Sequence, residues 1–210
     1  MSDRSPARQL VLVVDDDESM RVALTYLFRS MELDVKVFSS APQVLEAGIP
    51  DVPCCLVLDI RLPGVSGLDF QDMLTKAGLD VPIVFMTGHG DIPMSVRAMK
   101  AGAVDFLTKP FRDQDMLDAV TRALTKDRER RNALSAVADL QVRHDSLTPR
   151  QRELFILVAA GLMNKQIAAR LQVSEVTVKI HRGIMTKKMG ARSVADLARM
   201  ADALDVKLAR

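Results

Sequence analysis

Five short apolar segments, separated by stretches with helical periodicity, occupy the first half of this 210-residue chain and constrain its fold more than any other feature. The segments are rich in Val, Ile and Leu, and such runs are typical of strands covered on both faces, as in a parallel sheet. Strands that alternate with helices form βαβ units, so we predict a doubly wound α/β domain with a five-stranded parallel sheet. The expected strands are 10–14, 35–38, 54–58, 83–86 and 104–107, and the expected helices lie near 18–31, 41–47, 67–76 and 92–101.

Residues 112–145 predict one long, charged surface helix that begins on the first domain and bridges to a second. Its two apolar stripes, separated by the almost wholly charged residues 126–132, are Leu117, Val120 and Leu124, then Leu134, Val137 and Leu140. A helix paired between two copies of the chain is the alternative, and the broken stripe makes it the weaker interpretation.

The last part of the chain predicts an all-α domain. Thr148 and Gln151 form the sequence pattern of a capping box before a buried helix, and Ser174 caps a later helix over 175–189. With a short helix at 164–171 and a tight turn between them, this arrangement is typical of a helix-turn-helix, and a fourth helix is expected at 195–204. The predicted organisation is a disordered start at 1–8, a first domain at 9–123, a linker helix at 124–145 and the helix-turn-helix domain at 146–210.

Charge is distributed unevenly along the chain, although the net charge is only +2. Residues 1–110 hold 10 basic and 15 acidic groups, whereas residues 146–210 hold 12 basic and 5 acidic groups. An acidic first domain and a basic last one indicate two units with different partners. The longest stretch without a charged or strongly polar residue has ten residues, and a membrane-spanning helix needs about 20. Cys54 and Cys55 are adjacent in an apolar run, which favours buried thiols in a reducing cytosol over a disulfide or zinc site.

Polar residues follow several of the predicted strands. Asp15 and Asp16 follow the first strand, Asp59 follows the third, Thr87 the fourth and Lys109 the fifth. Because ligands bind beyond the carboxyl ends of such strands, we expect these side chains to meet in one pocket. Crowded carboxylates with room for water suit Mg²⁺, and a carboxylate nucleophile beside a hydroxyl and an ammonium suits the acceptance of a phosphoryl group.

A simpler explanation exists for each aspartate alone, since Asp commonly ends a strand and caps the following helix. The joint occurrence of all five residues favours the pocket. Asp17 and Glu18 are expected to start the first helix without binding a metal directly.

Four separated motifs in this region, VVDDDESMR, LVLDIRLPGVSGLDF, FMTGHGD and AGAVDFLTKPF, occur in an order that resembles the receiver domain of two-component response regulators. The resemblance covers about residues 9–123 and implies a flavodoxin-like fold. It further implies that Asp59 accepts phosphate from a sensor histidine kinase and that Thr87 and Lys109 contact the phosphoryl oxygens. The implied Mg²⁺ ligands are Asp15, Asp16, Asp59 and the backbone carbonyl of Arg61.

The resemblance also implies a conformational switch. Phe106 matches an aromatic residue that rotates inward as Thr87 moves, and Pro110 matches a proline after a cis peptide bond. The surface expected to change comprises residues 91–101, 106–107 and 112–123.

The segments LTPRQ, AAGLMNKQIA and SEVTVKIHRGIM closely resemble the LuxR-type DNA-binding domain over residues 147–201. The whole chain resembles the NarL/FixJ family, and the strings LMNKQIA and GHGDIPMSVRAMKAGAVDF lie closer to its FixJ- and StyR-like members. Helix 175–189 is then the recognition helix in the major groove of double-stranded DNA. The expected DNA contacts are Asn164, Lys165, Thr177, Lys179, Ile180, Arg182, Thr186, Lys187 and Lys188.

Gly183 lies in the interior of the predicted helix, where glycine lowers stability by about 0.5–1 kcal/mol relative to alanine. Two explanations stay open for it: close approach of DNA, or a neutral exposed position. Lys179 is the strongest candidate for a base contact, and Ile180 could meet a thymine methyl group.

Together these features predict a cytoplasmic bacterial transcription regulator that is phosphorylated on Asp59, dimerises and binds DNA, with activation the commoner outcome and RNA polymerase a further candidate partner. It is no enzyme beyond its own phosphorylation and dephosphorylation. One alternative is a DNA-binding regulator whose first domain docks partners without phosphate. Another is an aspartyl-phosphate phosphatase, which Arg61 disfavours because such enzymes usually carry a second Asp at that position.

Overall fold

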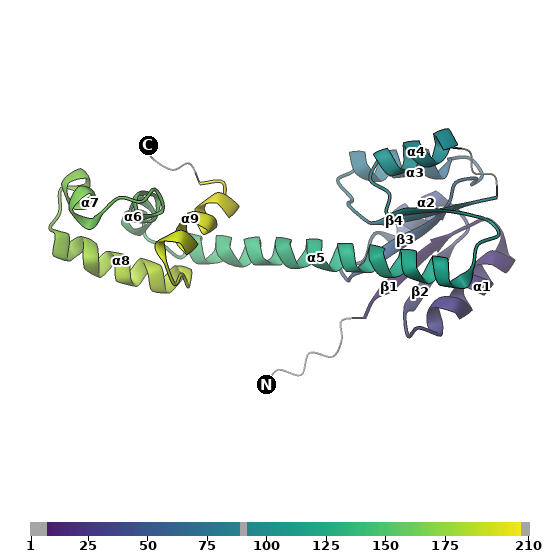
Figure 1. Cartoon of the computed structure of the whole chain (residues 1–210), viewed down its shortest axis with the longest axis horizontal. Helices are drawn as coiled ribbons and strands as arrows, with labels where there is room; N and C mark the ends of the chain where they lie inside the picture. Colours follow the sequence, from purple (N-terminus) through teal and green to yellow (C-terminus); the bar gives the residue numbers. More distant parts are fainter. Residues whose placement is uncertain (1–7, 89–91, 207–210) are drawn as a thin grey trace. The chain divides into compact units, whose positions relative to one another are not determined.

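The computed structural model describes residues 8–88 and 92–206, and the chain divides into two compact units, Met1–Arg131 and Asn132–Arg210. The first unit contains a parallel sheet with the strand order β2-β1-β3-β4-β5 (Figure 1). Its strands are β1 (Leu10–Val14), β2 (Asp34–Phe38), β3 (Cys54–Asp59), β4 (Ile83–Thr87) and β5 (Asp105–Thr108).

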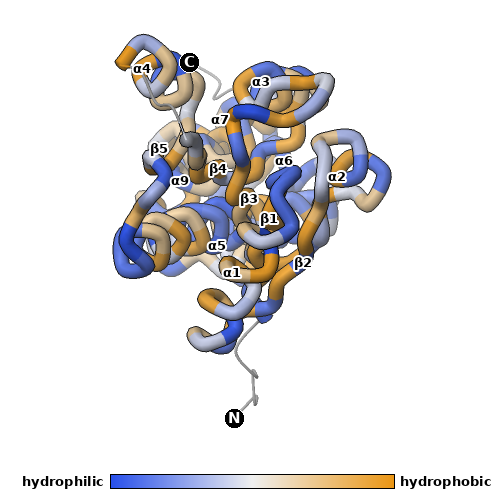
Figure 2. Tube along the Cα trace, turned by 90° about the vertical axis from the view of Figure 1, so that its right-hand side faces the viewer, coloured by the Kyte–Doolittle hydropathy of each residue, from blue (hydrophilic) through white to orange (hydrophobic). Residues whose placement is uncertain are grey.

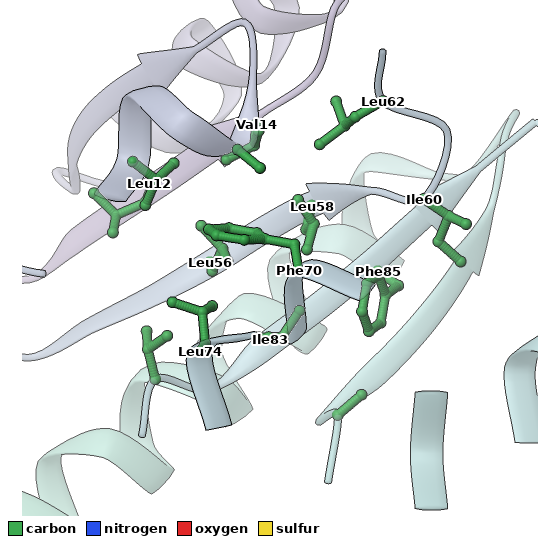
Figure 3. Packing of buried hydrophobic residues seen from close by; sticks show 14 of the residues in the cluster. Leu12, Val14, Leu56, Leu58, Ile60, Leu62, Phe70, Leu74, Ile83 and Phe85 are labelled. Carbon is green, nitrogen blue, oxygen red and sulfur yellow. The ribbon is translucent and has the colours of Figure 1, made fainter. Parts of the chain in front are cut away.

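Helices cover both faces of this sheet, so its side chains form two cores. One face packs against α2 (Ala41–Ala47), α3 (Gly67–Lys76) and α4 (Ile92–Lys100); Phe70 of α3 lies among Leu56, Leu58 and Phe85 (Figure 3). The other face packs against α1 (Glu18–Arg29) and the first turns of α5 (Asp113–Asp145). The fold class predicted from the alternating apolar runs is therefore confirmed.

The three central strands are fully buried and are drawn largely in orange in Figure 2. The prediction that all five strands are covered on both faces is wrong for β2 and β5, which are only partly buried. Both are edge strands with a neighbour on one side only, so the helical layers cover them less completely.

Local sequence signals explain where the helices begin. Asp17 is the N-cap of α1, and its carboxylate accepts a hydrogen bond from the Ser19 N–H at 2.8 Å. Its role as a helix-start residue is confirmed. Ser66 caps α3 in the same way, accepting from the Asp69 N–H at 3.1 Å. Each cap satisfies a backbone donor that has no partner within the helix.

As far as residue 206, where the described part of the second unit ends, four helices pack around a core of their own after the last turns of α5. Thr148 and Gln151 form the predicted capping box at the start of the first of these helices. A left-handed residue, Gln172, makes the tight turn of the helix-turn-helix. The helices are α6 (Pro149–Ala159), α7 (Asn164–Leu171), α8 (Glu175–Met189) and α9 (Val194–Ala203).

Helix α5 is continuous over 33 residues, and the first unit ends inside it at Arg131. The predicted disordered start lies, apart from Arg8, outside the described residues. Within the described ranges, no helix is long and apolar enough to cross a membrane.

A buried carboxylate in α5 fastens this helix to the sheet. The Asp127 side chain is fully buried and accepts a hydrogen bond from the Cys54 N–H, at the start of β3, at 2.9 Å. Arg130 and Arg131 donate to the same carboxylate at 2.6 and 2.7 Å, and Arg131 also reaches the Asp51 carboxylate at 2.7 Å. Burial alone would raise the pKa of Asp127, but these hydrogen bonds and charges outweigh it and lower the pKa.

Replacing Asp127 by Ala should strongly destabilise the first unit. The variant leaves two arginines and one buried N–H without their shared partner, which costs about 3–5 kcal/mol in the free energy of unfolding. Chemical denaturation followed by circular dichroism measures this loss, and amide exchange at Cys54 should accelerate. Asp139→Ala, at an exposed position of the same helix, is the control. Equal stability of the two variants would contradict the role assigned to Asp127.

Candidate functional site

The carboxyl edge of the sheet brings together residues from three separate strands. Asp15 directly follows β1, and Asp59 is the last residue of β3; because Val14 pairs with Leu58, the two aspartates are neighbours across the sheet. Lys109 follows β5, and its Nζ lies 2.6 Å from Asp15 Oδ2 and 2.6 Å from Asp59 Oδ2. The predicted convergence of these three side chains is confirmed.

Backbone groups orient the two carboxylates. The Asp17 N–H donates to Asp15 Oδ1 and the Arg61 N–H donates to Asp59 Oδ1, each at 2.9 Å. The Arg21 guanidinium donates to the backbone carbonyls of Asp15 and Asp16 at 2.7 and 2.9 Å, and so holds the acidic loop against α1. Sequence reasoning missed Arg21, although a cation shortly after an acidic loop was the available signal.

Burial and charge oppose one another in this pocket. Burial raises the pKa of the Asp15 carboxyl, even though the hydrogen bond and charge of Lys109 lower it. Burial also lowers the pKa of Lys109, but the hydrogen bonds and charges of Asp15 and Asp59 outweigh it, so its net pKa is raised. Lys109 is therefore firmly cationic and compensates two carboxylates at once.

Asp16 completes an acidic cluster. One oxygen each of Asp15, Asp16 and Asp59 lies within 4.8 Å of the others, with Asp16 exposed and the other two buried. A small set of carboxylates that reaches solvent through Asp16 fits Mg²⁺, which keeps several waters, and this is where the Mg²⁺ site implied by the receiver resemblance would lie. The carbonyl of Arg61 as a further ligand stays a prediction.

Thr87 and Phe106 share one face of the sheet. Thr87 is the last residue of β4 and is buried, and its carbonyl accepts a hydrogen bond from the Lys109 N–H at 2.7 Å. Phe106 pairs with Phe85, and Thr87 pairs with Thr108. Side chains two residues apart in a strand point to the same face, so Phe106 and Thr87 both point to the face of the sheet that α4 covers. Phe106 is only partly buried.

The Lys109–Pro110 peptide bond is cis, as the resemblance implied. The surface predicted to change shape is described only from Ile92 onward, since residue 91 lies outside the described residues. On it, α4 exposes Ile92, Val96 and Met99, and Arg122 of α5 forms an ion pair with Asp105 of β5.

In the second unit, α8 turns Val178 and Met185 into the core and leaves Ile184 43% exposed. Asn164 and Arg182 come together, since Arg182 Nη1 donates to Asn164 Oδ1 at 2.8 Å. Four further predicted contact residues are exposed, and their side chains form none of the described hydrogen bonds or ion pairs. They are Lys165, Lys179, Ile180 and Lys187.

Three predicted contact residues differ from this group. The Thr177 hydroxyl lies 2.8 Å from the hydroxyl of the N-cap Ser174, and Thr186 is only partly exposed. Lys188 Nζ donates to the Ser146 carbonyl at 2.9 Å and to Gln151 Oε1 at 3.0 Å. Thr177 and Lys188 thus have partners within their own unit, and their roles toward DNA stay predictions.

A parallel sheet with an acidic, lysine-bridged pocket, followed by a helix-turn-helix, defines a two-domain response regulator. The sequence model of the response regulator receiver domain matches residues 11–121, and that of bacterial regulatory proteins of the luxR family matches residues 145–201. The chain belongs to the two-component response regulator family, with a LuxR-type DNA-binding domain, and is FixJ/StyR-like.

Individual relatives extend over nearly the whole chain. Nodulation protein W of Bradyrhizobium diazoefficiens is 57% identical over 199 residues, which are 95% of this chain and 88% of that protein. The transcriptional regulatory protein FixJ of Azorhizobium caulinodans is 40% identical over 191 residues, 91% of this chain and 90% of that protein. The solved structure of the response regulator StyR has a TM-score of 0.83 and 47% identity, and covers 93% of this chain and 99% of that chain.

Removing the cation from the pocket should make Asp15 a weaker acid. In Lys109→Met the hydrogen bond and the charge that lower the pKa of Asp15 are gone while burial remains, so this pKa should rise further. A carboxyl ¹³C NMR titration without divalent ions measures the change. Lys126→Met, at an exposed position of α5, should leave the titration of Asp15 as in the wild type. An unchanged midpoint in Lys109→Met would contradict the bridging role.

Proposed function

We propose that a sensor histidine kinase phosphorylates this protein on Asp59, after which it dimerises and binds double-stranded DNA to regulate, most simply to activate, transcription. The observation that carries the proposal is the bridge from Lys109 to both Asp15 and Asp59. It sets the Asp59 carboxylate beside a cation and within the acidic cluster, where it can serve as a carboxylate nucleophile.

In the transfer step, an oxygen of Asp59 forms a bond to the phosphorus of a phosphohistidine. The P–N bond breaks, and its electron pair stays on the imidazole nitrogen of the kinase. The Lys109 ammonium then has a dianionic phosphoryl group to contact, and the Thr87 hydroxyl can donate a hydrogen bond to one of its oxygens.

Asp15, Asp16, Asp59 and the carbonyl of Arg61 would hold Mg²⁺ in this pocket. The bound ion supplies positive charge that offsets the charge of the transferring phosphoryl group. The Arg21 guanidinium and the Asp17 N–H hold the acidic loop in place through their hydrogen bonds. The carboxylates would therefore need little rearrangement when the ion binds.

The proposed switch follows from the shared face of Thr87 and Phe106. When Thr87 moves toward the phosphoryl group, the space it leaves can be filled by Phe106, which is only partly buried. This couples a local charge to the surface of α4, β5 and α5, whose exposed apolar side chains suit contact with a second copy.

The DNA-binding half of the proposal is supported by the basic second unit and by its match to the luxR family. We expect this action on double-stranded DNA to take place in the bacterial cytoplasm, with RNA polymerase as the partner for activation. Relatives named as transcriptional regulatory proteins agree with this role.

A phosphatase is the less favoured function. The residue two positions after Asp59 is Arg61, whose N–H orients the nucleophile and whose guanidinium is no general acid. A phosphate-independent docking module would have no use for the lysine-bridged carboxylates.

Light scattering with Mg²⁺, with and without beryllofluoride, tests the proposal. Beryllofluoride imitates the phosphoryl group on Asp59, so the mass of the wild-type chain should double and its affinity for duplex DNA should rise. Asp59→Asn should stay monomeric under both conditions, and Asp69→Asn, an exposed aspartate outside the pocket, should behave as the wild type. Unchanged mass and DNA affinity of the wild type would favour the docking module instead.

Mg²⁺ alone should raise the unfolding temperature of the first unit, because a ligand that binds only the folded state stabilises it by mass action. Asp16→Asn should lose most of this increase, as it removes an exposed ligand without disturbing the Lys109 bridge. Asp17→Ser is the matched control, since serine can still cap α1 and keeps the pocket intact. Differential scanning calorimetry at several Mg²⁺ concentrations measures the shifts; equal shifts in both variants would exclude Asp16 as a ligand.

A further inference from the structure

The outward face of α8 is unusually apolar for an exposed helix surface. Val178, Met185 and Met189 are buried, and the opposite side presents Val176 at 67%, Ile180 at 58% and Ile184 at 43% exposure. Each of these three side chains is β-branched, which is a poor choice for an exposed helix on grounds of propensity alone. A row of exposed apolar side chains is typical of a surface that contacts a partner.

Gly183 lies at the edge of this face, one turn after Ile180 and next to Ile184 in the sequence. A side chain built there would have no atom within 4 Å, and the backbone needs no left-handed conformation. Glycine therefore serves neither packing nor backbone geometry in the free protein, while it costs helix stability. What it provides is a gap in the outward surface, where a partner can come closer to the helix axis.

The groups around this gap point to DNA as the partner. Lys179 and Lys187 are exposed on the same side of α8, and Lys165 is exposed at the start of α7. Glu175 is the one acidic residue within α8, and it lies at the N-terminal end, away from the gap. Cations beside an apolar strip match a major groove, which has phosphates at its rims and thymine methyl groups on its floor.

We propose that Gly183 determines specificity: its missing side chain lets α8 sit deep enough in the major groove for Ile180 and Ile184 to contact thymine methyl groups. The inference rests on the proposed DNA-binding function and adds the feature of DNA that is recognised. Lys179 and Lys187 supply contacts to phosphates or guanine, whereas the apolar strip distinguishes thymine from the other bases.

Because the operator is unknown, the first experiment selects bound sequences from a random duplex library, using the full chain with Mg²⁺ and beryllofluoride. The enriched duplex is then made again with uracil in place of thymine in its half-sites, which removes only the methyl groups. Fluorescence anisotropy at one fixed salt concentration compares the two. The wild type should bind the uracil duplex about fourfold more weakly for each methyl group that it contacts.

Variants at the gap supply the decisive comparison. Gly183→Ala should raise the unfolding temperature, because alanine favours the helix, yet bind the selected duplex about tenfold more weakly. Gly183→Leu should lose more, and both variants should bind an unrelated duplex as the wild type does. Ile180→Ala should become less sensitive to uracil, whereas Val194→Ala, which shortens an exposed β-branched side chain of α9, should keep the full sensitivity.

The outcomes separate the inference from the function on which it rests. If the library yields no enriched sequence, sequence-specific binding itself fails, and the inference fails with it. If a sequence is enriched but Gly183→Ala binds it as tightly as the wild type, or uracil changes nothing, the inference alone is overturned.

Discussion

The ammonium of Lys109, held 2.6 Å from two carboxylates, is the interaction on which the first unit's chemistry depends. Asp15 and Asp59 are buried side by side at the sheet edge, and two like charges there would repel one another without a cation. The register of β1 and β3 places Asp15 and Asp59 next to each other, and Lys109 directly follows the residues of β5. Arg21 of α1 holds the acidic loop in place. A divalent ion or a phosphoryl group that binds here adds a further charge beside Lys109. It therefore changes the balance between the ammonium and the two carboxylates.

Much of this arrangement could be predicted from the sequence, for a definite physical reason. Continuous Val/Ile/Leu runs mark buried parallel strands, and residues that directly follow such strands must meet at one edge of the sheet. The sequence alone therefore predicts that Asp15, Asp59 and Lys109, which are far apart in the chain, lie close together. The helix N-caps at Asp17 and Ser174 can be predicted from the sequence as well, because capping depends only on neighbours within three residues.

Contacts between side chains that are distant in the sequence cannot be predicted from the sequence pattern. Asp127 lies in a run of charges that suggests a solvated helix surface, yet its carboxylate is buried against the Cys54 N–H, 73 residues away in sequence. Lys188 likewise belongs to a basic run that suggests DNA contact, whereas its ammonium bonds to Ser146 and Gln151. Periodicity assigns a residue to a face of a helix, but it does not say which groups of another segment face it there.

These unpredicted contacts join the end of α5 to the end of α8 within the second unit. Arg143, in the last turn of α5, donates to the carbonyl of Met189 at the end of α8 at 3.2 Å. Lys188 of α8 donates in return to the carbonyl of Ser146, directly after α5. Each helix thus supplies a cation to the carbonyls at the end of the other, where the helix dipole favours positive charge. The two bonds run in opposite directions between the same two helix ends and so couple the last turn of α5 to the last turn of α8. A displacement at the end of α5 would therefore act on α8 through the C-terminal end of α8.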